Sequence, residues 1–263
     1  MNIGTILSAI FVNPFLNLLI GLRSVMPGHD LGLAIIAVTI IVRLVLYPFS
    51  ARQIRSQRAM QELQPRIDEI RAKHKDDREA QSKALLEFYR ENKVSPLSSC
   101  GPLLIQTLLI YPLFFVFRMA ITGADFGTRL YPFINHPALP INTHFLGIVD
   151  LAAVHNIPLA VLTAVAQFFQ SWMLVRRNKK NQPVGPDGKP AKQDPSQALS
   201  NNLVYIFPLL TGYFAYTFPA GLALYWLAST LFAIGQQFII MRSTASKPKD
   251  PTTHGTAEAV VVR

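Results

Sequence analysis

Residues 31–51 constrain the fold of this chain more than any other stretch. Their sequence, LGLAIIAVTIIVRLVLYPFSA, contains a single charge, Arg43. A helix rises about 1.5 Å per residue, so a segment of this length spans a hydrocarbon core of about 30 Å. An arginine at the centre of such a helix costs about 2.5–3.5 kcal/mol on insertion scales. The segment therefore predicts a transmembrane helix whose one charge needs an explanation.

The distribution of charge along the chain indicates the class of protein. After Asp194 the next charged residue is Arg242, which leaves 47 consecutive uncharged residues, enough for two spans and a turn. The 263 residues are 50% hydrophobic with a formal net charge of +10, and the charges are confined to a few segments. This segregation predicts an all-α integral membrane protein that crosses the bilayer several times.

The apolar segments predict five transmembrane helices. They are expected at residues 31–51, 97–117, 151–175, 199–217 and 220–241. The other segments are expected to be a helical hairpin at 52–96, an irregular outer segment at about 122–147, a flexible basic linker at 176–198 and a disordered tail at 242–263.

The positions of the lysines and arginines orient these spans. Of the 25 basic residues, the hairpin holds 11, the linker 6 and the tail 4. The opposite side holds Arg23 and Arg129, with Arg118 near that boundary. The positive-inside rule therefore places the hairpin, the linker and the tail in the cytoplasm. With five spans, the N-terminus lies outside.

Residues 1–29 are apolar but interrupted by polar positions. On a helix through this segment, small or polar residues share one face and apolar residues the other: Asn13, Asn17, Gly21 and Ser24 against Phe15, Leu18, Leu19 and Leu22. This pattern favours an amphipathic helix lying in the extracytoplasmic interface of the membrane. A sixth span is the alternative.

Residues 52–93 differ completely from the span before them, since 19 of these 42 residues are charged. Each half carries a thin apolar stripe, and a polar break at 74–77 separates the halves; the stripes are Met60, Leu63, Ile67 and Ile70, then Leu85, Phe88 and Tyr89. This pattern predicts a water-exposed antiparallel helical hairpin, with Pro65 as a bend or a helix start. A binding role for this charged surface is a hypothesis.

Two interpretations of Arg43 are open. The residue lies four positions before Tyr47, roughly 6 Å of helix from the predicted cytoplasmic boundary, so its guanidinium could snorkel to the headgroups. Alternatively it faces the bundle interior, where polar groups must accompany it because an isolated charge is unstable in lipid. The candidate companions are Thr39, Gln106, Gln167, Gln170, Tyr225 and Trp226.

The interior interpretation has a consequence for water. No aspartate or glutamate falls inside any predicted span, so Arg43 lacks an ion-pair partner there. A charge surrounded by neutral hydrogen-bonding groups requires hydration, and the sequence therefore suggests a hydrated cavity. Each glutamine taken singly is explained equally well by an ordinary hydrogen bond between helices.

No cofactor or metal is expected. Cys100 is the only cysteine, and the six histidines have no helical ligand spacing, so we read them as solvated or structural. A phosphate-binding GxxxxGK[ST] loop is missing, which argues against nucleotide hydrolysis.

Four fragments, in order along the chain, carry a resemblance to a known family. They are TIIVRLVLYPFSARQ, MQELQPRIDEIRAKHKDD, SPLSSCGPLLIQ and FPAGLALYW followed by QQ. From about residue 11 to 241 the chain resembles the YidC family of membrane-protein insertases, in a minimal form similar to Gram-positive-type members. Four residues depart from the family's usual asparagine, glycine, proline and asparagine, which puts the local groove geometry in doubt: Ser95, Ser99, Thr107 and Thr230.

The resemblance implies a function. It implies a five-span core at 30–241 with a groove that is lipid-accessible, open to the cytoplasm and closed outside, and with Arg43 at its floor. The implied partners are nascent membrane proteins and lipids, with a translating ribosome and a Sec-type translocon as candidates for the basic cytoplasmic segments, and no DNA. The implied location is the bacterial inner membrane, and the protein would not be an enzyme.

Two other classes of protein are alternatives to an insertase. A small-solute transporter with Arg43 as an anion site is the runner-up, but internal repeats and matching broken helices are not evident in the sequence. An intramembrane protease would need a serine–histidine pair, a carboxylate dyad or metal ligands within the spans, and these are missing.

Overall fold

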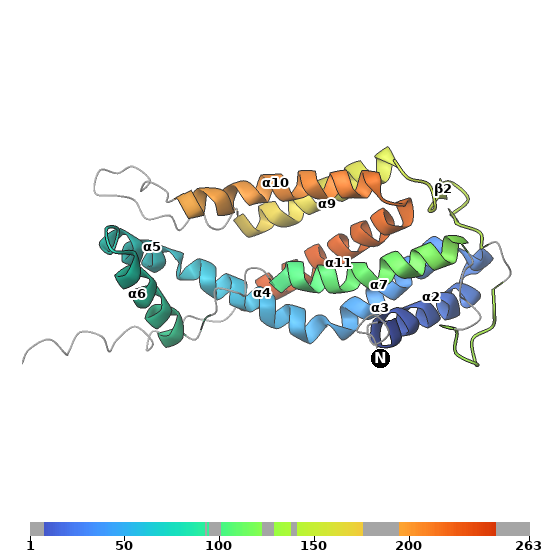
Figure 1. Cartoon of the computed structure of the whole chain (residues 1–263), viewed down its shortest axis with the longest axis horizontal. Helices are drawn as coiled ribbons and strands as arrows, with labels where there is room; N and C mark the ends of the chain where they lie inside the picture. Colours follow the sequence, from blue (N-terminus) through green and yellow to red (C-terminus); the bar gives the residue numbers. More distant parts are fainter. Residues whose placement is uncertain are drawn as a thin grey trace, which may run out of the picture.

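Long helices run side by side along the longest axis of the molecule, and a shorter helical pair lies beyond one end (Figure 1). The computed structural model describes residues 8–92, 94, 101–122, 129–137, 141–175 and 195–245. The long helices are α3 (Leu31–Val45), α7 (Gly101–Thr122), α9 (Ile157–Val175), α10 (Pro195–Thr217) and α11 (Ala220–Ala245).

The first predicted span is not one straight helix. Helix α3 ends at Val45, and α4 (Tyr47–Glu62) begins after Leu46 with its axis turned by 66°. Pro48 explains the bend, because its missing N–H leaves the Leu44 carbonyl without the usual helical donor and its ring crowds the preceding turn. The prediction of a continuous helix over 31–51 is therefore wrong. Arg43 lies in the last turn of α3, directly before the bend.

The charged segment after the bend forms the predicted helical pair. Helix α5 (Gln64–Lys73) has Pro65 in its first turn, as expected for a helix start, and packs against α6 (Arg78–Glu91). Asp77 caps α6 by accepting hydrogen bonds from the backbone N–H groups of its first turn.

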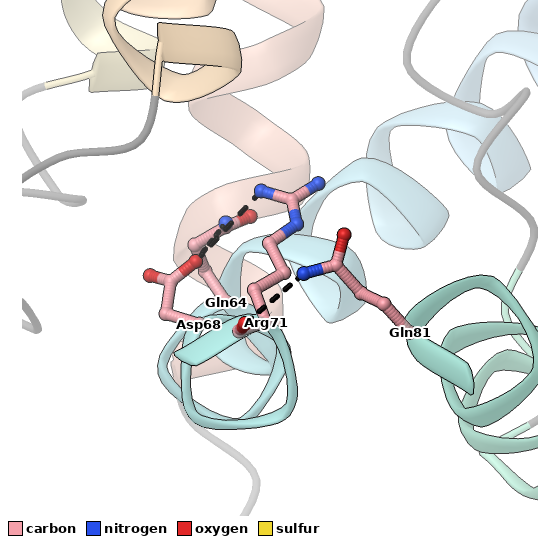
Figure 2. Close-up of polar contacts among 4 residues, drawn as sticks. All are labelled: Gln64, Asp68, Arg71 and Gln81. Carbon is pink, nitrogen blue, oxygen red and sulfur yellow. Dashed lines mark hydrogen bonds and ion pairs between the residues drawn. The ribbon is translucent and has the colours of Figure 1, made fainter. Parts of the chain in front are cut away.

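Polar contacts reinforce this pair (Figure 2). The side-chain amide of Gln81 on α6 donates to the Arg71 carbonyl on α5 over 3.0 Å. Within α5, Gln64 donates to Asp68 over 3.0 Å, and Arg71 lies 3.9 Å from the same carboxylate. The apolar seam between the helices is thin, since Ile67 is the one buried residue of α5 and α6 in the described part.

The predicted start of the third transmembrane helix, residue 151, is too early. Helix α9 starts at Ile157, where the side chain of Asn156 accepts a hydrogen bond from Leu159 N over 3.0 Å. The apolar residues before it are not helical; their backbone groups instead bond the turn between α10 and α11. The bonds are Gly221 N to Leu151 O (2.9 Å), Ala220 N to Ala153 O (2.8 Å) and His155 N to Tyr216 O (2.9 Å).

The described residues are mostly helical, as predicted, with a small β-hairpin that the sequence analysis did not expect. Within the irregular outer segment, β1 (His144–Phe145) pairs antiparallel with β2 (Val149–Asp150). The Phe145 ring covers Gly32 of α3, where any Cβ would collide with it. The β-hairpin therefore packs against the N-terminal end of α3.

The N-terminal segment forms a π-helical turn η1 (Ser8–Val12) and helix α2 (Asn13–Val25), which packs against α3. Leu16, Leu19 and Ile20 are buried in the main apolar cluster, which also draws on α3, α7, α9 and α11. The predicted polar face of α2 is only partly exposed to solvent: Ser24 is exposed, whereas Asn17 is buried and bonds the segment that begins at Arg129. Whether α2 lies on or crosses the membrane stays a prediction.

The number of spans also stays a prediction. Among the described residues, Ala220–Ile240 is long and apolar enough to cross a membrane alone, and the bent α3–α4 pair passes the same test as a unit. Shorter apolar helices cover Ala9–Val25, Ile110–Met119 and Ile157–Met173. Most of the predicted linker (176–194) and tail (246–263), and the start of the second predicted span, lie outside the described residues.

Candidate functional site

The guanidinium of Arg43 points into the helical bundle, toward α7 and α11. Its Nε donates to Ser229 Oγ over 3.0 Å, and its Nη2 contacts the same hydroxyl. Nη2 also donates to Gln106 Oε1 over 3.4 Å. The snorkelling interpretation is therefore not the arrangement in the structure, and Gln106 is brought to Arg43 as the interior interpretation expects.

Two further predicted residues lie on α11, one turn before Ser229. Tyr225 is buried, and its hydroxyl lies near Arg43 and Ser229 without a hydrogen bond of normal geometry. Trp226 follows it and is buried in the apolar cluster. Tyr225 and Ser229 share one face of α11 because they are four residues apart.

The other three predicted residues have no hydrogen bond to Arg43 among the described contacts. Thr39 is buried one turn before Arg43, and its hydroxyl donates to the Ile35 carbonyl of its own helix over 2.7 Å. Gln167 donates to Gln170 over 3.3 Å, so these two glutamines pair with each other on α9. The predicted set thus divides into an arginine cluster and a separate glutamine pair.

Sequence reasoning missed the central acceptor, Ser229. The sequence does contain a pattern that indicates Ser229. It lies four residues after Tyr225 and seven before Gln236, and residues at these spacings share one helix face. Gln236 is also buried, and its amide lies 3.5 Å from the carbonyl of Tyr47, next to the bend. The polar face of α11 therefore follows α3 and α4 past the bend.

Several buried donors in this region have no partner in the described part of the chain. They are the side-chain nitrogens of Gln53, Gln106 and Gln237 and the hydroxyl of Tyr225. Buried polar groups in folded proteins are almost always hydrogen-bonded, to water where no protein group is available. Of these atoms, the Gln106 amide and the Tyr225 hydroxyl belong to groups near Arg43, and they support a hydrated interior there.

The chemistry open to this arrangement is polar binding. One fixed positive charge stands among neutral donors and acceptors, so carboxylates and other polar groups are the ligands it attracts. Among the described residues no group of three histidines, cysteines or acidic residues could hold a metal ion.

The fold and site define a class: a helical membrane protein with a charged, polar cluster inside an apolar bundle. A family model described as 60Kd inner membrane protein matches residues 22–247, and the chain belongs to this family. The predicted resemblance to the YidC insertases is confirmed by relatives named "Membrane protein insertase YidC". Those of Francisella tularensis subsp. novicida (strain U112) and subsp. tularensis (strain WY96-3418) are each 36% identical over 211 residues.

A solved structure shows a similar fold. The "Active YidC insertase crystal structure with the first transmembrane domain resolved" matches with a TM-score of 0.57 and 27% identity, over 87% of this chain and 45% of that one. The match to the two Francisella relatives covers 80% of this chain but 32% of theirs. The chain thus spans about a third of the length of these curated relatives.

Proposed function

We propose that this chain is the core of a membrane-protein insertase. It receives a nascent membrane protein from the cytoplasm, holds its polar segment beside Arg43 and releases its apolar helix sideways into the bilayer. The observation that carries the proposal is a partly buried guanidinium inside the bundle whose hydrogen-bond partners among the described residues, Ser229 and Gln106, are both neutral. It is a binding and translocation function without covalent chemistry.

The physics of insertion gives this charge a role. A polar segment that enters hydrocarbon must leave hydrogen bonds to water unsatisfied, and hydrated protein groups shorten the dry distance it crosses. A fixed positive charge also attracts acidic residues of that segment. The proposed groove comprises Arg43 and Gln106 with Ser229 and Tyr225, while Thr39, Trp226 and the Gln167–Gln170 pair line its extension toward α9.

The apolar part of the substrate needs a different surface. Helix α9 exposes bulky apolar side chains along its length, among them Val161, Leu162, Val165, Phe168 and Phe169. A substrate helix lying against α9 and α11 would bury apolar surface on one side and meet lipid on the other. It could then partition into the bilayer without crossing a polar barrier.

The proposed orientation follows from the charge distribution. Five spans put the N-terminus outside and the hairpin, linker and tail in the cytoplasm of a bacterial cell, at its inner membrane. Nascent membrane proteins and lipids are the proposed partners. A translating ribosome and a Sec-type translocon are the proposed partners of the basic cytoplasmic segments.

Photo-crosslinking to a stalled nascent membrane protein tests the function. A photoreactive residue at Val42 or Ser229, beside Arg43, is expected to crosslink the polar segment of the substrate. The matched control is Leu209, an exposed residue of α10 that lies outside the arginine cluster. Equal crosslinking from Leu209 and Ser229 would contradict the proposal. A small-solute transporter, the second candidate, would give no nascent-chain crosslink at all.

A further inference from the structure

We propose that residues 131–133 and 146–148 form a lipid-binding rim, whose exposed apolar side chains insert into the extracytoplasmic leaflet of the membrane. The rim consists of Tyr131, Phe133, Leu146 and Ile148. The inference rests on the proposed orientation of the chain, which places this segment outside, and it does not depend on insertase activity.

The composition of the segment is the first observation. The 20 residues between Arg129 and Asp150, LYPFINHPALPINTHFLGIV, contain no lysine, arginine, aspartate or glutamate. The described part of this segment leaves Phe133 78% and Ile148 83% exposed. A loop in water seldom combines full exposure of large apolar side chains with a lack of charge. Aromatic and aliphatic side chains of this kind are favoured at the headgroup boundary of a bilayer.

The turn at the tip of the β-hairpin is the second observation. Leu146 and Gly147 both have positive φ, 50° and 71°, and Ile148 N donates to Phe145 O over 3.0 Å. A two-residue turn of this type favours asparagine, aspartate or glycine at both positions. Leucine is unfavourable there, both for its backbone conformation and for its exposed side chain. Turn geometry therefore does not account for Leu146, whereas contact with lipid does.

The rim is held in place by buried or capping polar groups. At its second half, Leu146 N donates to Asp30 Oδ2 over 2.6 Å, while Asp30 Oδ1 accepts from Leu33 N and caps α3. At its first half, Tyr131 N donates to Asn17 Oδ1 over 2.6 Å. The Asp30 attachment lies at the N-terminal end of α3, which faces outside in the proposed orientation, and the Asn17 attachment lies near the middle of α2, the helix packed against α3. The apolar side chains are thus presented by a fixed backbone.

The rim continues along the chain into a surface that faces lipid in the proposed orientation. After β2, Val154 and Ile157 are exposed, and the exposed apolar face of α9 follows. A lipid occupant explains this continuity. A second copy of the chain or another protein would have to cover the rim and leave the adjoining helix face to lipid.

Spin labelling tests the rim directly. Because Cys100 is the only cysteine, a Cys100→Ser background allows single labels at Leu146→Cys and at Ile148→Cys. The matched control is Leu86→Cys, a leucine of α6 that is 68% exposed on the charged hairpin. In proteoliposomes, the labels at the rim are expected to collide several-fold more with oxygen than with a water-soluble nickel chelate, relative to the control.

Three results would overturn the proposal. The first is a nickel chelate that reaches both rim labels as readily as the Leu86→Cys label. The second is dipolar broadening between rim labels that disappears on dilution with unlabelled protein, which indicates a second copy. The third is exclusion of both reagents from both rim labels. Sided labelling with an impermeant thiol reagent, in the same single-cysteine variants, reports separately whether the orientation itself is wrong.

Discussion

At the scale of single residues, the notable feature is that Arg43 is held by uncharged groups. Ser229 and Gln106 accept its hydrogen bonds without neutralising it. A guanidinium has five donors, so these acceptors leave capacity for water or for a substrate carboxylate. The residue is thus both fixed in direction and available for binding.

Replacing Arg43 tests the electrostatic role. Arg43→Ala is expected to reduce insertion of a substrate with an acidic extracytoplasmic tail about tenfold more than a neutral-tailed version, equivalent to about 1.4 kcal/mol. Arg43→Lys keeps the point charge and should retain much of the activity. Reconstituted insertion assays with the paired substrates measure both effects. Equal activity of wild type and Arg43→Ala on the acidic substrate would exclude the electrostatic role.

Replacing Ser229 tests the positioning of the guanidinium. Ser229→Ala removes the hydroxyl that both Nε and Nη2 contact, and insertion is expected to fall by about two- to fivefold, because water replaces part of the lost interaction. Ser229→Thr keeps the hydroxyl and is the matched control. Thermal unfolding in detergent checks that both variants fold. An unchanged insertion rate in Ser229→Ala would show that this hydroxyl has no positioning role.

At the scale of elements, the sequence predicts helices better than it predicts their ends. Apolar runs locate α3, α9, α10 and α11, because burial in lipid or core depends on composition. The bend after α3 was missed because Pro48 is compatible both with the end of one helix and with the first turn of another. The start of α9 was missed because residues 151–154 are apolar enough to extend the hydropathy, although their backbone bonds the turn before α11.

In the candidate site too, the sequence predicts which residues are involved better than it predicts their contacts. Arg43 and Gln106 were predicted together because each is a polar residue in an apolar run. Gln167 and Gln170 were predicted as companions of Arg43 in the groove; they bond each other on α9, and their place in the groove stays a prediction, since hydropathy does not say which helices are neighbours. Ser229 was missed because a serine in a membrane helix is common, and only the packing of α11 against α3 gives it a role.

The hairpin of α5 and α6 is expected to be mobile relative to the long helices. Its apolar seam is thin, and elements with few buried apolar contacts open at low free energy. Hydrogen exchange in proteoliposomes should be faster for amides of α5 and α6 than for those of α11. Exchange as slow in α6 as in α11 would contradict this expectation.

The outer β-hairpin is expected to loosen in acid. Hydrogen bonds from Thr143 Oγ1 (2.7 Å) and Ala152 N (2.9 Å) hold the pKa of Asp150 below its ordinary value of 3.8. Because the folded pKa is the lower one, this stabilisation is present above about pH 4 and is lost as the pH falls further. The protection factor of the Leu151 amide, which donates to the Thr143 carbonyl, should decrease accordingly. Asp150→Asn should remove the pH dependence.

At the scale of the whole molecule, the charged α5–α6 pair lies at one end of an elongated shape along which the long helices run (Figure 1). This charged pair lies at the end opposite the small β-hairpin and the capped start of α3. This polarity matches an orientation in which one end meets the cytoplasm and the other the outside.

Single-cysteine labelling tests that orientation. With Cys100→Ser as background, a cysteine at Lys83 in the hairpin should react with an impermeant reagent only after the membrane is opened. A cysteine at His136 in the outer segment should react in intact cells. The reverse pattern would show that the spans are inverted, and reaction of both from outside would change the number of spans.

The bend between α3 and α4 makes α4 the long arm of a lever, with the α5–α6 hairpin at its far end. The pivot is Leu46. The carbonyl of the next residue, Tyr47, lies 3.5 Å from the side-chain amide of Gln236 on α11. Helix α4 has 16 residues, a length of about 24 Å, while Arg43 lies about 4.5 Å from the pivot. When α3 and α4 rotate as one rigid body about Leu46, a movement of about 5 Å at the far end of α4 moves Arg43 by about 1 Å. We expect such a displacement to lengthen the 3.4 Å hydrogen bond from Arg43 to Gln106 beyond hydrogen-bonding distance, so that a force on the α5–α6 hairpin would change the contacts of the guanidinium.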